Sequence, residues 1–295
     1  MAAMITITLF SDEVMLAGTH VVLASLLAHT STPLQVILFA DHIREREKVL
    51  LRGTFALHNK LDSLLEIRDF SPQPLAGANN LHGNATTYGR LSLPELLPQH
   101  CGVIYLDCDL VINGDIGKLV QIPTNKVLYA SAISTREYSV DRNLFIKAKL
   151  NLGDPYFNAG VLGINLSRWR ALDVTRKCDS AARQYPNMFR SADQAILNLV
   201  LADEFQEGGP AMNQPLYYFT DKLLNPPGHI FHFVGSPKPW DLFGRRIHKN
   251  YSLWHDYYKT TALSNQSPYR YLSFRRVCYT FPTVFRAWRQ SKKAT

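Results

Sequence analysis

Two aspartates one residue apart, Asp107 and Asp109, are the residues of this sequence whose types and spacing best support chemistry. They follow an apolar run in "VIYLDCDLVI", with Cys108 between them. Ligands of open α/β sheets bind beyond the carboxyl ends of strands, so the pair is well placed to meet one. Carboxylates so placed can hold a hard divalent cation against a diphosphate. Two solvated aspartates in a turn are the alternative interpretation.

The segment "HFVGSPKPW" supplies complementary groups. His232 could be a third metal ligand through its neutral imidazole. Gly235 would let the backbone approach a phosphate, and Lys238 could hold that phosphate by charge. Taken singly, such a histidine is more often a hydrogen-bonded core residue and such a lysine a solvated one. Their occurrence together with the aspartate pair favours a metal–diphosphate site.

Two further segments carry polar residues beside apolar elements. Asn158 precedes Ala159 and Gly160 in "YFNAGVLGINL", where small residues could leave room for a bulky ligand such as a hexose. A tight turn before a core strand is the alternative. Asp193 and Gln194 open "DQAILNLV", where a carboxylate could accept hydrogen bonds from sugar hydroxyls. Plain capping of a helix N-terminus is the alternative there.

The elements that must position these residues alternate between strands and helices. "MITITLFSD" and "TPLQVILFAD" read as buried strands, with a helix between them over Leu16 to Ala28. Arg44 to Lys60 has helical spacing, and "LLEIRDF", "VLYASAI" and "AGVLGINL" read as further strands. We expect "GVIYLDCDLVI" to be one strand running out into polar residues, and "NPPGHIFHFVGSPKPW" to be an ordered loop. This order predicts an α/β fold with a mainly parallel, Rossmann-like sheet flanked by helices.

The basic excess of the chain lies at its end. The net charge is +8, and after Asp256 there is no acidic residue but there are eight basic ones. Aromatic residues such as Tyr279, Phe281 and Trp288 are interleaved with them. Such a segment suits adsorption to anionic lipid, at about 1 kcal/mol per basic residue near the surface. It accompanies no recognised nucleic-acid motif, so we expect no nucleic-acid partner.

We therefore divide the chain into a catalytic domain over residues 1–250 and a small, basic, helical membrane-association region over 251–295. The four cysteines are scattered and fit neither a disulfide framework nor zinc-site spacing. The start of the chain shows neither a signal peptide nor an apolar run of the roughly 20 residues that a bilayer span needs. These features predict a cytoplasmic location.

The sequence resembles glycosyltransferase family 8, a retaining family that contains bacterial lipopolysaccharide galactosyl- and glucosyltransferases and glycogenin. The resemblance runs roughly from Ile5 to Trp240 and rests on five segments in order: "TTYGRL", "YLDCDLVI", "YFNAGVLGINLSRW", "DQAILN" and "HFVGSPKPW". It is strongest to the lipooligosaccharide α-galactosyltransferases, which also end in a basic, aromatic, membrane-attaching tail. The resemblance implies a GT-A fold.

It also implies Mn²⁺ as cofactor, with Mg²⁺ possible, and a UDP-glucose or UDP-galactose donor. The acceptor would be a saccharide or glycolipid of lipopolysaccharide or another surface glycan, at the inner face of the cell membrane. Asp107, Asp109 and His232 would be the metal ligands, and Gln194 and Asp193 the catalytic residues. The implied nucleotide-sugar-binding residues are Asp12, Met15, His82, Arg90, Asp107, Cys108, Asn158, Gly235 and Lys238.

The chain departs from the galactosyltransferase pattern at two places. Val14 and Met15 stand where those enzymes have an asparagine and a tyrosine that stacks on uracil, although a methionine can pack against a base. Ser134 stands at or near an acidic position of their acceptor pocket. A catalytically silent saccharide-binding or scaffold protein with the same fold is the alternative function. A phosphate-ester hydrolase would need further carboxylates for a two-metal centre.

Overall fold

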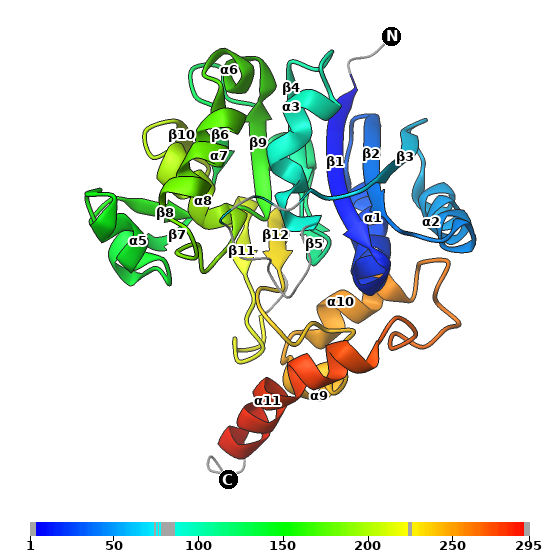
Figure 1. The fold of residues 1–295 in the computed structure, drawn as a ribbon. Coiled ribbons are helices and arrows are strands. Elements are labelled where there is room, and N and C mark those ends of the chain that lie inside the picture. Colours follow the sequence, from blue (N-terminus) through cyan, green and yellow to red (C-terminus); the bar gives the residue numbers. More distant parts are fainter. Residues whose placement is uncertain (1–3, 74, 76, 78–85, 224–225, 292–295) are drawn as a thin grey trace.

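A seven-stranded sheet forms the centre of the computed structural model, which describes residues 4–73, 75, 77, 86–223 and 226–291 (Figure 1). Its strand order is β10-β6-β9-β4-β1-β2-β3. The strands are β1 (Ile5–Asp12), β2 (Leu34–Asp41), β3 (Leu64–Phe70), β4 (Gly102–Leu106), β6 (Leu128–Ala130), β9 (Val161–Asn165) and β10 (Phe205–Glu207). Four pairs, β1 with β2, β1 with β4, β2 with β3 and β10 with β6, are parallel. Only β9 of this sheet runs antiparallel to its neighbours. The prediction of a mainly parallel α/β sheet is confirmed.

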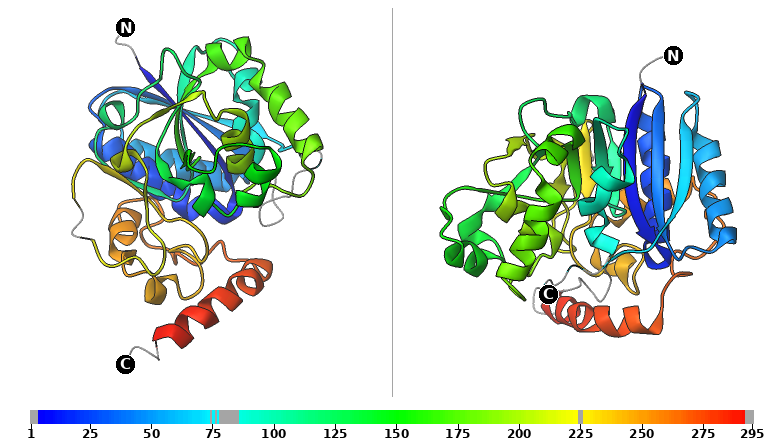
Figure 2. Two further views of the ribbon diagram at one scale, coloured as in Figure 1. Left: turned by 90° about the vertical axis from the view of Figure 1, so that its left-hand side faces the viewer. Right: turned by 45° about the horizontal axis from the view of Figure 1, so that its top comes forward.

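Helices cover both faces of this sheet (Figure 2). The α-helices are α1 (Leu16–His29), α2 (Glu45–His58), α3 (Leu93–Leu96), α4 (Ile116–Leu119), α5 (Arg142–Lys147), α6 (Leu166–Ala171), α7 (Val174–Gln184), α8 (Asp193–Val200), α9 (Gly244–Ile247), α10 (Tyr251–Tyr258) and α11 (Phe274–Ser291). Short 3₁₀ helices occupy η1 (Glu13–Met15), η2 (Thr86–Ser92), η3 (Arg136–Tyr138) and η4 (Pro210–Met212).

Two buried clusters divide the core because successive strand residues point to opposite faces. On one face Ile7 and Leu9 of β1 pack with the apolar residues of α1 and α2. On the other face Phe10 packs with residues of α6, α7 and α8. Helix α1 is buried almost all round, which fits its apolar character on every side. It is enclosed by the sheet, α2 and α10.

The expectation of a single strand over "GVIYLDCDLVI" is wrong. Strand β4 ends at Leu106, and after Asp107–Asp109 the chain starts a second strand, β5 (Leu110–Asn113), in another sheet. There β5 pairs antiparallel with β12 (His229–His232), which lies beside β11 (Gln214–Pro215). The predicted loop "NPPGHIFHFVGSPKPW" thus contains a strand. A further hairpin-like pair consists of β7 (Ala132–Thr135) and β8 (Pro155–Phe157).

The register of this second sheet determines where His232 lies. His232 lies opposite Leu110, the residue that directly follows the aspartate pair. A histidine distant in sequence is thereby brought beside Asp109.

The C-terminal helices lie below the carboxyl ends of the central strands (Figure 1). Leu253, Trp254 and Tyr258 of α10 share a buried cluster with Ala17 and Val21 of α1. Helix α11 extends away from the sheet at its far end (Figure 1). No helix in the described part of the chain is long and apolar enough to cross a bilayer. The role of residues 251–295 in membrane association stays a prediction.

Candidate active site

A cavity of about 1000 Å³ opens where β1, β2 and β4 end. It is the place at which an α/β sheet offers a ligand site. Eight predicted site residues line it: Asp12, Met15, Arg90, Asp107, Cys108, Asp109, Gly235 and Lys238. Four others, Asn158, Asp193, Gln194 and His232, lie outside its lining as the described residues define it. His82 lies outside the described residues.

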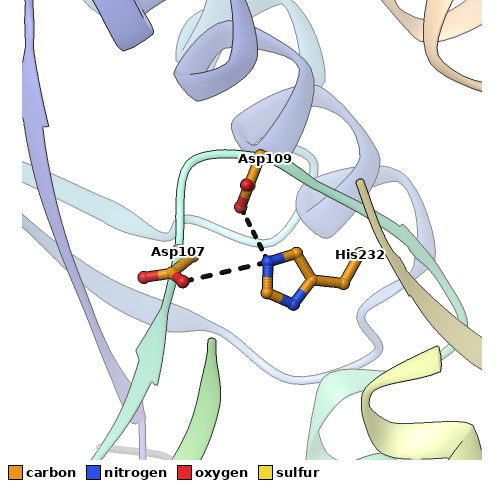
Figure 3. Close-up of side chains that lie close together, drawn as sticks. All are labelled: Asp107, Asp109 and His232. Carbon is orange, nitrogen blue, oxygen red and sulfur yellow. Dashed lines mark ion pairs between the residues drawn. The ribbon is translucent and has the colours of Figure 1, made fainter. Parts of the chain in front are cut away.

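Asp107, Asp109 and His232 converge from two sheets (Figure 3). One possible ligand atom from each lies within 4.8 Å of the others. The Nε2 atom of His232 is 3.1 Å from Oδ1 of Asp109 and 3.9 Å from Oδ2 of Asp107. The three side chains that the sequence singled out as metal ligands therefore lie together.

Two asparagines and a glycine hold the imidazole of His232 in place. Its Nδ1 lies 3.0 Å from Oδ1 of Asn213. The Nδ2 of Asn213 donates to Oδ1 of Asn158 at 2.7 Å, and the same oxygen accepts a bond from the Gly160 amide at 2.8 Å. A Cβ on Gly160 would overlap the imidazole ring. The small residue at 160 thus makes room for His232. The expectation that Ala159 and Gly160 leave room for a hexose stays a prediction.

The cluster fits a divalent cation. Oδ1 of Asp109 is buried, and no hydrogen bond from any described residue satisfies it. A second carboxylate and an imidazole nitrogen stand beside it. Two oxygens and one nitrogen are compatible with Mn²⁺ or Mg²⁺, and the imidazole favours Mn²⁺, the softer of the two.

Lys238 brings a positive charge to the same wall. Its ammonium group donates to Oδ2 of Asp109 and, at 2.7 Å, to the carbonyl oxygen of Phe233. Burial would raise the pKa of Asp109, but the ammonium charge of Lys238, with a smaller contribution from the neighbouring His232, outweighs burial and holds that pKa well below its ordinary value. Asp109 is therefore an anion at neutral pH. Gly235 precedes this lysine with a φ of 80°, a left-handed conformation that favours glycine.

Arg90 connects the aspartate pair to Asp193. Its Nη2 is 2.9 Å from Oδ1 of Asp107, and its Nε is 2.8 Å from Oδ2 of Asp193. The guanidinium lies over the Tyr105 ring, 4.3 Å from its centre. Thr87 donates to the other oxygen of Asp193 at 2.6 Å. Burial raises the pKa of Asp193 although Arg90 and Thr87 partly oppose this.

Gln194 is fixed by three hydrogen bonds. Its Oε1 accepts from Nδ2 of Asn158 at 3.0 Å and from the amide of Ala159 at 3.1 Å. Its Nε2 donates to the hydroxyl of Tyr156 at 2.8 Å. Both lone pairs of the amide oxygen are thereby engaged.

Asp12 and Cys108 have local structural partners at the cavity edge. Asp12 caps η1 by accepting a bond from the Met15 amide at 3.0 Å. Burial, with a contribution from the neighbouring Asp41, raises its pKa. Burial likewise raises the pKa of Cys108 to about 12, so its thiol stays neutral, and it donates to the carbonyl of Phe10.

Several residues of this site escaped the sequence analysis. Asn213, Thr87 and Tyr105 hold predicted residues, and Asp241 accepts a bond from the Lys238 amide at 2.6 Å. Thr87 and Tyr105 lie in or beside quoted motifs, and Asp241 directly follows one. Asn213 stands in no recognised motif.

The fold and this strand-end cavity define a GT-A glycosyltransferase. A solved structure described as the galactosyltransferase LgtC in complex with donor and acceptor sugar analogs aligns with a TM-score of 0.71. The alignment covers 87% of this chain and 96% of that one at 22% identity, which shows the shared fold. The sequence pattern described as "Glycosyl transferase family 8" matches residues 6–243, and the chain belongs to that family.

Curated relatives agree with this assignment. The glycosyltransferase GlyE of Streptococcus pneumoniae is 28% identical over 188 residues, which are 58% of this chain and 42% of that protein. The lipopolysaccharide 1,2-glucosyltransferase of Escherichia coli is 27% identical over 159 residues, 47% of this chain and 44% of the relative. The matched region thus spans less than half the length of each of these two relatives.

Proposed function

We propose that this protein is a metal-dependent, retaining hexosyltransferase that moves glucose or galactose from a UDP-sugar to a saccharide acceptor. The observation that carries the proposal is the position of Asp107, Asp109 and Lys238 at one wall of the cavity, with His232 close beside the two aspartates. Relatives named as lipopolysaccharide glucosyl- and galactosyltransferases support an acceptor in lipopolysaccharide or another surface glycan. Retention rests on the resemblance to family 8.

One set of residues would act on the leaving diphosphate and another on the transferred sugar. Asp107, Asp109 and His232 would hold Mn²⁺ or Mg²⁺, which when bound neutralises charge on a diphosphate. Lys238 would stabilise the negative charge that develops on the leaving UDP, because its ammonium group is fixed at the cavity wall before the reaction starts. Gly235 would allow the backbone beside it to approach the phosphates. Arg90 would fix the position of Asp107, a proposed metal ligand, relative to Asp193, a proposed sugar-binding residue, because it contacts both.

The hydrogen bonds of Gln194 favour attack by the acceptor on the same face from which UDP leaves. An amide oxygen is a weak nucleophile, and the Asn158 and Ala159 donors already engage this one. Gln194 would instead position and stabilise the sugar together with Asp193. A UDP phosphate oxygen would take the proton of the acceptor hydroxyl.

We also propose that helix α11 attaches the protein to an anionic membrane surface, at the cytoplasmic face. Phe274, Phe281 and Phe285 are 84%, 54% and 42% exposed. They recur at helical spacing on α11, beside the basic side chains of Arg275 and Arg286. Aromatic rings and cations on one helix suit the interface of an anionic bilayer.

Vesicle flotation tests the membrane proposal. The protein should float with vesicles that contain phosphatidylglycerol and stay behind with pure phosphatidylcholine. A variant with Phe274, Phe281 and Phe285 replaced by serine should lose this binding. Equal flotation of the variant would contradict the proposal.

A donor assay tests the enzymatic proposal. UDP release from UDP-glucose and UDP-galactose is measured with and without Mn²⁺, together with an Asp109→Asn variant. We expect Mn²⁺-dependent release from one of the two donors, which the variant lacks. A silent scaffold would release no UDP, and a phosphate-ester hydrolase would instead cleave simple phosphate monoesters.

A further inference from the structure

Helix α11 forms part of the wall of the donor cavity. Ser273, just before the helix, and Arg275, Arg276 and Tyr279 within it line the same cavity as the aspartate pair. A segment predicted only to meet the membrane therefore also faces the space proposed for the nucleotide-sugar.

Arg276 ties α11 to the loop that carries Lys238. Its Nε and Nη2 donate to the two oxygens of Asp241 at 2.8 and 2.7 Å, a paired geometry that fixes direction as well as distance. Asp241 is completely buried and also accepts a bond from the Lys238 amide. The position of α11 is thus coupled to that of the loop proposed to hold phosphate.

Tyr279 and Asp12 line the same cavity as Arg276. Burial lowers the pKa of Arg276, but the carboxylate of Asp241, with smaller contributions from Asp12 and Tyr279, raises it above its ordinary value. Asp12 and Tyr279 are therefore both within electrostatic reach of Arg276. Asp12 ends β1 and would meet the nucleoside part of a donor.

Tyr279 is also the most accessible aromatic ring of this cavity. The other aromatic residues among the described lining, Phe10, Tyr105 and Phe189, are buried. Phe10 stacks on Phe39, and Tyr105 lies under the guanidinium of Arg90. Tyr279 is 47% exposed. Met15 and this tyrosine ring from α11 both line the cavity that a nucleobase would enter.

We propose that Tyr279 contacts the nucleobase of the donor and that Arg276 is the positioning residue that holds α11 over it. The inference rests on the proposed function, since it takes a nucleotide as the ligand. An aromatic ring supplied late in the chain would compensate for the absence of one at position 15.

Calorimetric titration of the full chain with UDP in the presence of Mn²⁺ tests this inference. Base–aromatic stacking is lost on removal of the ring, so Tyr279→Ala should bind UDP about 5- to 50-fold more weakly. Tyr279→Phe keeps the ring and should stay within about twofold of the wild type. Tyr138→Ala, which removes an exposed tyrosine ring outside the cavity lining, is the matched control and should bind UDP normally.

Inorganic pyrophosphate separates base contact from general damage to the site. It lacks a base, so Tyr279→Ala should bind Mn²⁺–pyrophosphate as the wild type does. Tyr279→Leu, which keeps an apolar side chain without a ring, should repeat the loss for UDP if the alanine variant folds poorly.

The outcomes distinguish two failures. If wild type and Tyr279→Ala bind UDP equally, the inference is overturned and the proposed function stands. If the wild type binds UDP no more tightly than pyrophosphate, no base contact exists and the inference is likewise overturned. If the wild type binds neither ligand with Mn²⁺, the proposed function fails together with the inference.

Discussion

The imidazole of His232 donates its Nδ1 proton to the side-chain oxygen of Asn213, 3.0 Å away. The direction follows from the neighbouring bonds. Asn158 Oδ1 accepts from the Gly160 backbone N–H, so the Asn213 atom that meets this oxygen must be the donor Nδ2. The Oδ1 of Asn213 then faces the imidazole, which leaves the lone pair of Nε2 directed at the aspartates.

Replacing Asn213 should weaken metal binding. Groups that orient a metal-ligating histidine typically contribute about 10- to 100-fold in metal affinity, and we expect a loss in this range for Asn213→Ala. Asn213→Asp keeps an oxygen acceptor and should restore most of the affinity. Titration with Mn²⁺, followed by the electron paramagnetic resonance of the free ion, measures both. Unchanged affinity in the alanine variant would show that His232 needs no such partner.

Adding one methyl group at Gly160 should disable the site. The new Cβ would overlap the His232 ring and force it away from Asp109. Because a displacement of about 1 Å can cost about 100-fold in rate, Gly160→Ala should lower Mn²⁺-dependent UDP release by about that factor. Gly153→Ala, where a Cβ would make only ordinary contacts, is the control. Normal activity of Gly160→Ala would mean that the ring can move without loss.

The pair of Arg276 and Asp241 should matter for stability. Arg276→Met would leave the buried carboxylate of Asp241 without its cation, which typically costs about 3 kcal/mol. Urea denaturation gives the change in unfolding free energy. Arg286→Met, at an exposed position of the same helix, should change it little. The double variant Arg276→Met, Asp241→Asn should lose less than the sum of the single losses, and strict additivity would argue against a coupled pair.

Acid should destabilise the protein through His20. This residue is fully buried with Nδ1 2.6 Å from the Thr54 hydroxyl, and burial lowers its pKa from 6.5 to about 3. Between these values the unfolded chain binds a proton that the folded chain does not. The contribution of His20 to the free energy of unfolding is therefore complete above pH 6.5. It is lost as the pH falls toward 3, by about 1.4 kcal/mol per pH unit.

Urea denaturation at pH 7, 6 and 5 measures this slope. His20→Asn should reduce it, whereas His42→Asn at an exposed position should leave it unchanged. The same slope in wild type and His20→Asn would assign the acid sensitivity to other groups.

The first half of the central sheet was predictable because its signals are local. The strands β1 and β2 are 8 residues long and the helix between them has 14, and the structure places all three nearly where the sequence does. The clustering of Asp107 and Asp109 with His232 was also expected, through the resemblance to a family. Their roles as metal ligands stay predictions.

The break between β4 and β5 was not predictable from polarity. Leu106 and Leu110 both belong to apolar stretches, so the pattern reads as one strand. The chain turns there because β5 finds its partner in β12, more than a hundred residues later. Pairings of this kind leave no periodic signal.

Buried polar partners were missed for a related reason. Asn213, Asp241 and Arg276 act through contacts with residues that are distant in sequence or lie on another element. An isolated asparagine or arginine in a sequence can have many different partners, and only the folded structure shows which partner it has.

The antiparallel pairing of His232 with Leu110 makes the site sensitive to the length of the chain before it. Side chains alternate between faces along a strand, so a slip of β12 by one residue would turn the imidazole away from the carboxylates. Deleting one residue ahead of β12 would put Phe233 where the ligand should stand, unless the preceding loop absorbed the change. The register of β12 against β5 therefore determines whether the site can bind a cation. A shifted register would abolish cation binding even though all three ligand residues were still present in the sequence.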